Sequence, residues 1–90
     1  MTHPIVKWDI GVEGAITPQT PMPTMPEILR GAVVVVGGRA PIWRYGYAFH
    51  KLHGSAAAAI AVFDPRLGAV IIASHTPDVA EGDVLTDITW

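Results

Sequence analysis

The spacing of hydrophobic and polar residues along this chain predicts a series of short strands. Residues 4–12 alternate between apolar and polar side chains, which is the pattern of a strand with one buried face. The runs 32–36, 57–63 and 69–73 are apolar almost throughout, as expected of strands that are covered on both faces. A closing strand is expected over 84–90, after a turn that contains glycine.

One amphipathic helix is predicted over 41–53, where apolar residues recur at helical spacing and Pro41 suits the first turn. A capping box at the start of segment 24–30 predicts a single helical turn there. The resulting order favours an α/β fold, a small Rossmann-like mixed sheet with one βαβ crossover over 32–63 and antiparallel edge strands. We expect one domain over residues 1–90.

Composition narrows the class of protein. The chain has 90 residues, half of them hydrophobic, and no cysteine, so neither disulfides nor thiolate ligands can support so small a core. An interface between copies would bury the surplus apolar surface, and we therefore expect a homodimer. The sequence shows neither a secretory signal nor an apolar run long enough for a bilayer, which favours a cytoplasmic protein without membrane contact.

Positive charge gathers in the middle of a chain whose net charge is −2. Asp64 is the only acid between residues 39 and 75, a region that holds three of the four histidines. The cations of this region are Arg39, Arg44, Lys51 and Arg66. Because long nucleic acids usually require an overall basic domain, this distribution disfavours DNA and favours a small ligand with a few phosphates.

One candidate site lies at each end of the predicted helix. The turn 37–41 carries Gly38, Arg39 and Pro41 between a strand and a helix start, where backbone N–H groups favour an anion, although an ordinary tight turn is the alternative. His50 and His53 lie one turn apart near the helix end and could bind a metal or a phosphate, whereas a satisfied core histidine is the alternative for His53.

Further candidates follow the later strands. Asp64 heads a turn that also carries Arg66, and its carboxylate could serve a site or only cap a backbone N–H. Ser74 and His75 follow the strand over 69–73. Trp43 could stack on a base, with core or interface packing as the alternative.

Together these clusters supply carboxylate, guanidinium and imidazole, which could hold a divalent metal and a phosphodiester in one pocket. Without cysteine, oxygen and imidazole ligands remain, and these suit Mn²⁺, with Mg²⁺ as the alternative.

Four segments closely resemble one family of small CRISPR-associated proteins from type III systems. The segments are Gly-Gly-Arg-Ala-Pro-Ile-Trp (37–43), Ala-Phe-His-Lys-Leu-His (48–53), Ala-Val-Phe-Asp-Pro-Arg-Leu-Gly-Ala-Val (61–70) and Ser-His (74–75). Members of that family were first described as manganese-dependent RNA deadenylation exonucleases and later recognised as the third family of ring nucleases.

The resemblance implies a CRISPR-associated Rossmann-like fold and a symmetric dimer that degrades cyclic tetra-adenylate, with the ring held between two dimers. It implies that Asp64 holds Mn²⁺, that Arg66 contacts phosphate, and that His53 and His75 serve the catalytic or metal site. It also implies a ligand surface lined by Gly38, Arg39 and Pro41.

Three functions are compatible with the sequence. The first is a metal-dependent nuclease in which a ribose 2′-hydroxyl attacks the adjacent phosphorus of the ring and a histidine protonates the leaving oxygen. The second is a module that senses or sequesters the ring without cutting it. The third is a Mn²⁺-dependent exonuclease acting on the 3′ end of adenine-rich RNA.

Overall fold

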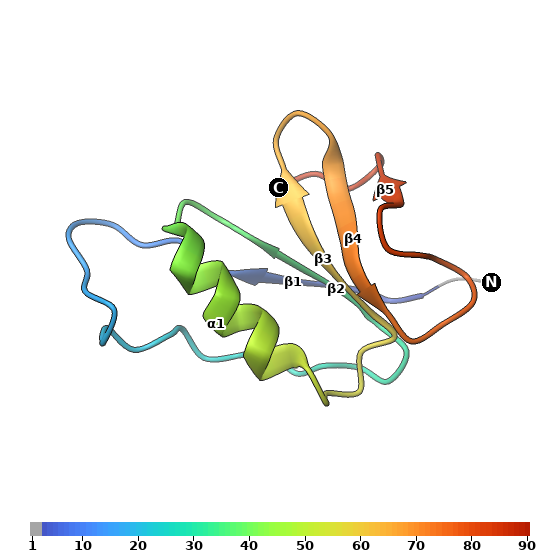
Figure 1. The fold of residues 1–90 in the computed structure, drawn as a ribbon, viewed down its shortest axis with the longest axis horizontal. Coiled ribbons are helices and arrows are strands. Elements are labelled where there is room, and N and C mark those ends of the chain that lie inside the picture. The colour runs from blue at the N-terminus through green and yellow to red at the C-terminus, as the bar shows by residue number, and fades with distance from the viewer. Residues whose placement is uncertain (1–2) are drawn as a thin grey trace.

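The computed structural model describes residues 3–90 and shows a five-stranded mixed sheet with one helix packed against it (Figure 1). In chain order the elements are β1 (Ile5–Asp9), β2 (Val33–Gly37), α1 (Ile42–Leu52), β3 (Ala59–Asp64), β4 (Gly68–Ser74) and β5 (Val84–Leu85). The strands also lie side by side in that order. β1, β2 and β3 are parallel, whereas β4 and β5 are antiparallel to their neighbours. The predicted α/β class, with a helix between parallel strands, is confirmed.

The apolar run of β2 forms the centre of the molecule because both of its faces are covered. Val34 and Val36 pack on the α1 side with Trp8 and Leu52. The side chains of Val33 and Val35 point to the other face of the sheet, where the packed residues include Ala61, Ile71 and Ile88. Strand alternation within an unbroken valine run therefore builds two cores at once.

The segment 24–30 is not helical, which corrects the prediction of a helical turn there. Met22, Met25 and Ile28 instead pack against the core on the α1 side. Prolines at 21, 23 and 26 remove backbone donors and favour extended backbone, so burial of these apolar side chains decides the conformation.

Two predicted strands are shorter in the structure. β1 ends at Asp9, although the N–H groups of Ile10 and Val12 still donate to the carbonyls of Gly37 and Arg39. The closing strand is reduced to β5, and the chain beyond it leaves the sheet. It ends with the Trp90 ring stacked on Phe63, with 5.6 Å between ring centroids.

Arg44 does not belong to the expected positive cluster, because it is buried and only 2% exposed. Its guanidinium donates hydrogen bonds to three backbone carbonyls of the proline-rich connection and the end of β1. The acceptors are Ile10 O at 3.3 Å, Thr20 O at 3.2 Å and Pro21 O at 3.1 Å. The cation therefore holds the segment 10–21 against α1.

We predict that Arg44→Leu destabilises the fold by about 2–4 kcal/mol, because it leaves three carbonyls without a donor. The exposed Arg30→Leu is the matched control and should change the free energy of unfolding by less than about 0.5 kcal/mol. Urea denaturation measures both. Equal effects of the two substitutions would contradict the structural role of Arg44.

Candidate functional site

The carboxyl ends of the three parallel strands meet at one end of the sheet (Figure 1). We call this the strand-tip end and define it by Asp9, Gly38, Arg39, Asp64 and Arg66. An open hollow of about 780 Å³ lies beside it. Its lining includes Asp9, Glu13, Arg39, Tyr45, Phe63 and Trp90. Open α/β sheets bind ligands at this position because the loops after the strands converge there.

The turn after β2 needs both of its glycines. Gly38 has a φ of +109°, and a Cβ at this position would lie 2.6 Å from the backbone nitrogen of Gly11. A Cβ on Gly37 would lie 2.7 Å from the ring of Trp90. Gly37 pairs with Asp9 on the neighbouring strand, so the indole sits directly beside the Asp9 position. The turn is therefore shaped by close packing as well as by its backbone conformation.

Tyr45 closes the hollow from the side of α1. Its hydroxyl donates to the carbonyl of Gly38. Partial burial raises the pKa of Tyr45, and the nearby carboxylate of Asp9 raises it further. The phenol therefore stays protonated and holds the glycine turn against the helix.

Asp64 and Arg66 form a local acid–guanidinium pair in the turn after β3. Asp64 Oδ1 accepts the backbone N–H groups of Arg66 at 2.7 Å and Leu67 at 3.2 Å. Asp64 Oδ2 lies 3.4 Å from the guanidinium of Arg66, whose side chain is 87% exposed. The N–H of Arg66 lowers the pKa of Asp64 most, followed by its guanidinium, although partial burial opposes the shift. The Asp64 carboxylate thus accepts the backbone N–H groups of its own turn, as expected for a capping residue.

The candidate imidazoles lie at the opposite end of the sheet, which we call the histidine end and define by His50, His53, Ser74 and His75. His50 is in the last turn of α1, and His53 is its C-cap residue. All three histidines are exposed, so His53 is not a core histidine.

Ser74 and His75 are held by backbone contacts at the end of β4. The hydroxyl of Ser74 lies 2.8 Å from the carbonyl of Val79 and accepts the N–H of Thr76 at 3.2 Å. The N–H of His75 donates to the carbonyl of Ala58 at 2.7 Å. The imidazole of His75 is thereby presented from a fixed backbone.

One chain does not gather all of these groups in the expected single pocket. β3 and β4 are antiparallel, with Asp64 paired to Gly68 and Ala59 paired to Ser74. The two pairs are five strand residues apart, which separates them by roughly 17 Å. Since α1 also runs back from the strand tips, its last residues and the C-cap His53 lie at the far end of the helix, away from the strand tips (Figure 1).

The described residues contain no cluster of three or more histidine or acidic side chains that could hold a metal ion. Asp64 has backbone N–H groups and a guanidinium around it, which are hydrogen-bond donors and not metal ligands. A single chain therefore does not fit Mn²⁺ or Mg²⁺ at the predicted position.

Pro41 and Trp43 lie at the start of α1, next to the strand-tip end. Pro41 is the N-cap residue and has extended backbone. Trp43 is half-buried and packs against Tyr47, with 5.7 Å between ring centroids.

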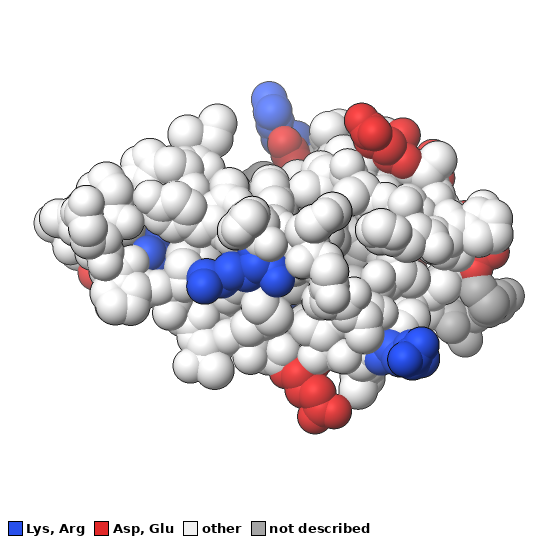
Figure 2. Space-filling view, turned by 60° about the horizontal axis from the view of Figure 1, so that its bottom comes forward, with Lys and Arg blue, Asp and Glu red and all other residues white. Residues whose placement is uncertain are grey.

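Basic side chains are scattered over the face drawn in Figure 2, where blue atoms stand apart from one another among uncharged ones. On this face the cations form no stripe of the kind that broad nucleic-acid surfaces carry. The one helix of the described residues is too short and too polar to cross a membrane.

Two residues of the hollow were not anticipated from the sequence. Asp9 ends β1 in the same way that Asp64 ends β3, and this shared position was the available signal. Trp90 falls in a segment that its pattern assigns to a strand, so no sequence signal indicated that it would cover Gly37.

A family model for a CRISPR-associated protein (Cas_csx3) matches residues 9–86. An uncharacterized protein of Aquifex aeolicus (strain VF5) is 49% identical over 53 residues, which cover 58% of this chain and 46% of that protein. The matched part thus spans about half the length of this relative. The family match includes both ends of the sheet, while His3 and Trp90 lie outside it.

We predict that Asp64 titrates below its ordinary value of 3.8, because three donors stabilise its charged form. Its contribution to stability is then present above pH 3.8 and is lost as the pH falls through the lowered pKa. Carboxyl-carbon NMR measures the midpoint. Asp64→Asn should destabilise the fold above this midpoint and progressively less as the pH falls through it, and a destabilisation that stays constant across the midpoint would contradict this account.

Proposed function

The chain belongs to the family of CRISPR-associated proteins that this match describes, and on that premise we propose that it is a ring nuclease that cleaves cyclic tetra-adenylate. The proposal includes a Rossmann-like classification, a cytoplasmic location and a homodimer that forms tetramers or longer stacks on the ring. The observation that carries it is the chemical difference between the two ends of the sheet. One end offers guanidinium groups, carboxylates and aromatic rings, and the other offers exposed imidazoles.

The strand-tip end is suited to recognise a nucleotide. The Trp90 ring is 42% exposed and is backed by Phe63, so an adenine could stack on it. Asp9 and Glu13 line the same hollow and could accept hydrogen bonds from the adenine amino group. Arg39 and Arg66 are exposed nearby and could neutralise the phosphates. The carboxylates and guanidinium groups would thus contact different parts of one ligand.

The histidine end is suited to proton transfer, because an imidazole has an ordinary pKa close to neutral pH. In the proposed reaction the 2′-oxygen of a ribose forms a bond to the adjacent phosphorus, and the bond from phosphorus to the 5′-oxygen breaks. The 2′-oxygen loses its proton to a base, and the 5′-oxygen takes a proton from His53 or His75. The product is a linear oligoadenylate with a 2′,3′-cyclic phosphate and a 5′-hydroxyl group.

Two copies are needed for one reaction, since roughly 17 Å separates the two ends within a chain. The ring would lie between the strand-tip end of one copy and the histidine end of another. The first copy binds and orients the ring, and the second supplies the proton. Recognition without cleavage is then the expected behaviour of a copy that lacks its neighbour.

Whether the reaction depends on Mn²⁺ or Mg²⁺ is a question for the cleavage assay. Asp64 alone supplies too few ligand atoms for a divalent cation, so Mn²⁺ or Mg²⁺ would have to take further ligands from the ring and from a second copy. We therefore assign no step of the reaction to a metal and include Mn²⁺, Mg²⁺ and chelator in the assay.

We predict that Arg66→Ala and His75→Ala are each at least about 100-fold slower on cyclic tetra-adenylate, because each removes one end of the site. Mixing the two inactive variants should restore roughly a quarter of the wild-type rate, as expected when copies combine at random. Chromatography of the products measures the rate. Lys51→Ala, which removes an exposed cation that the proposal does not use, is the matched control.

Failure of the mixture to regain activity would contradict the two-copy site. An intact ring with tight binding would instead support a sensor, and cleavage of linear adenine-rich RNA alone would support an exonuclease.

We predict that Trp90→Ala weakens binding of a 2′-O-methylated, uncleavable ring by roughly tenfold or more, because each stacked base contributes about 1–3 kcal/mol. Trp90→Phe keeps an aromatic surface and should bind within a few-fold of wild type. Isothermal titration calorimetry measures the affinity of wild type and of both variants, because it needs no tryptophan signal from position 90. Unchanged affinity in Trp90→Ala would exclude Trp90 as the stacking surface.

A further inference from the structure

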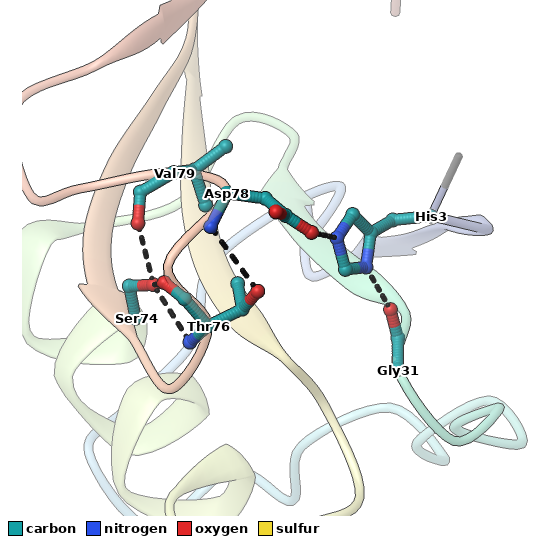
Figure 3. A network of polar contacts seen from close by, with 6 residues as sticks. All are labelled: His3, Gly31, Ser74, Thr76, Asp78 and Val79. Carbon is teal, nitrogen blue, oxygen red and sulfur yellow. Dashed lines mark hydrogen bonds and ion pairs between the residues drawn. The ribbon is translucent and has the colours of Figure 1, made fainter. Parts of the chain in front are cut away.

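His3 connects three segments that are far apart in the sequence (Figure 3). Its Nδ1 lies 2.6 Å from the carbonyl oxygen of Gly31, just before β2. Its Nε2 lies 2.8 Å from Oδ2 of Asp78, in the loop that follows β4. The imidazole is 15% exposed; its contact with Gly31 is partly buried, whereas its contact with Asp78 is open to solvent. A residue outside the matched family region thus ties the start of β1 to the histidine end.

Both partners of this imidazole are hydrogen-bond acceptors. A carbonyl oxygen and an ionised carboxylate carry no proton to donate, so both ring nitrogens must donate for both contacts to form. Only the imidazolium form of His3 carries two N–H groups. A neutral His3 would place one bare nitrogen against an acceptor, and one of the two contacts would be lost.

The charges around His3 favour its protonated form. The carbonyl of Gly31 raises the pKa of His3 most, and the hydrogen bond to Asp78 raises it further. Partial burial opposes the shift, while the charge of Asp78 adds to it. The direction agrees with the geometry, in which every hydrogen bond to the ring stabilises the cation.

The contact continues from Asp78 into the backbone on both sides of His75. The N–H of Asp78 lies 3.3 Å from Oγ1 of Thr76, and the N–H of Thr76 lies 3.2 Å from Oγ of Ser74 (Figure 3). The Ser74 hydroxyl reaches the carbonyl of Val79 at 2.8 Å. His75 stands between Ser74 and Thr76, so this network sets the backbone that carries its imidazole.

We propose that the imidazolium of His3 clamps the loop 75–79 to the starts of β1 and β2 and thereby positions His75. His3 does not touch the substrate in this role. The catalytic consequence rests on the function proposed above, whereas the clamp itself follows from the hydrogen bonds alone.

The sign of the pH effect follows from the raised pKa of His3. The clamp is complete below 6.5, the ordinary pKa of histidine, and is lost as the pH rises through the raised value. The loop should therefore be ordered in slightly acidic solution and looser in alkaline solution.

Two substitutions at Asp78 separate the charge from the contact. Asp78→Ala removes the acceptor and should loosen the loop at every pH. Asp78→Asn supplies an amide that can accept from a protonated Nε2 or donate to a bare one, so the bridge persists and its pH dependence disappears. His3→Gln can reach only one of the two acceptors through its amide N–H group and should resemble Asp78→Ala.

The test measures amide hydrogen exchange of residues 75, 76, 78 and 79 at pH 6 and pH 8, corrected for intrinsic rates, together with the NMR titration of His3. In wild type, exchange should quicken between pH 6 and pH 8, and His3 should titrate above 6.5. In His3→Gln and Asp78→Ala exchange should be fast at both pH values, and in Asp78→Asn slow at both. Exchange that is the same in wild type and His3→Gln at pH 6 would overturn the clamp.

The same variants are assayed for ring cleavage. His3→Gln should lower kcat by roughly tenfold or more with KM nearly unchanged, because a misplaced group slows chemistry more than binding. Asp78→Asn, in which the bridge persists, should keep the kcat of wild type. If amide exchange of the loop is faster in His3→Gln but its kcat equals that of wild type, the proposal that the clamp positions His75 is overturned. A wild-type protein that shows the clamp but cuts no ring would instead refute the proposed function and leave the clamp standing.

Discussion

The direction of the strands is the constraint on which the site depends. β3 continues the parallel part of the sheet, and the chain then returns through the antiparallel β4. Whatever follows β3 must therefore lie at the opposite end of the sheet from whatever follows β4. Asp64 and Arg66 occupy the first position, and His75 occupies the second. Because backbone hydrogen bonds fix this separation, no rearrangement of side chains within one chain can remove it.

The two ends are held by different kinds of contact. At the strand-tip end the glycine turn, the Asp64 turn and the stacked pair of Phe63 and Trp90 are set by backbone conformation and close packing. At the histidine end the loop after β4 is tied by one imidazole between two acceptors. The first arrangement suits a rigid recognition surface. The second depends on a proton, so it couples the position of His75 to pH.

Much of the fold could be predicted from the sequence, because the apolar runs and the amphipathic helix are decided by local periodicity. The prediction of a helical turn over 24–30 was wrong, because the prolines and the burial of Met22 and Met25 outweigh the capping pattern. Arg44 could not be recognised as a buried residue, because its partners are backbone carbonyls that leave no trace in the side-chain pattern. The residue types of the candidate site could be predicted from the sequence. The distance between its two ends could not, because it depends on the direction in which each strand runs.

The absence of cysteine allows a direct measurement of how copies meet on the ring. Leu67→Cys places a single thiol at the strand-tip end, and Pro77→Cys places one at the histidine end; both positions are exposed. The two variants are mixed with the uncleavable ring, oxidised, and separated by mass. In an equal mixture, random pairing makes the disulfide between unlike variants as frequent as the two like pairs together, and the two-copy account predicts that the ring raises the unlike disulfide above that level. A ring that binds tightly yet promotes only Leu67→Cys pairs would show two strand-tip ends face to face and would contradict it.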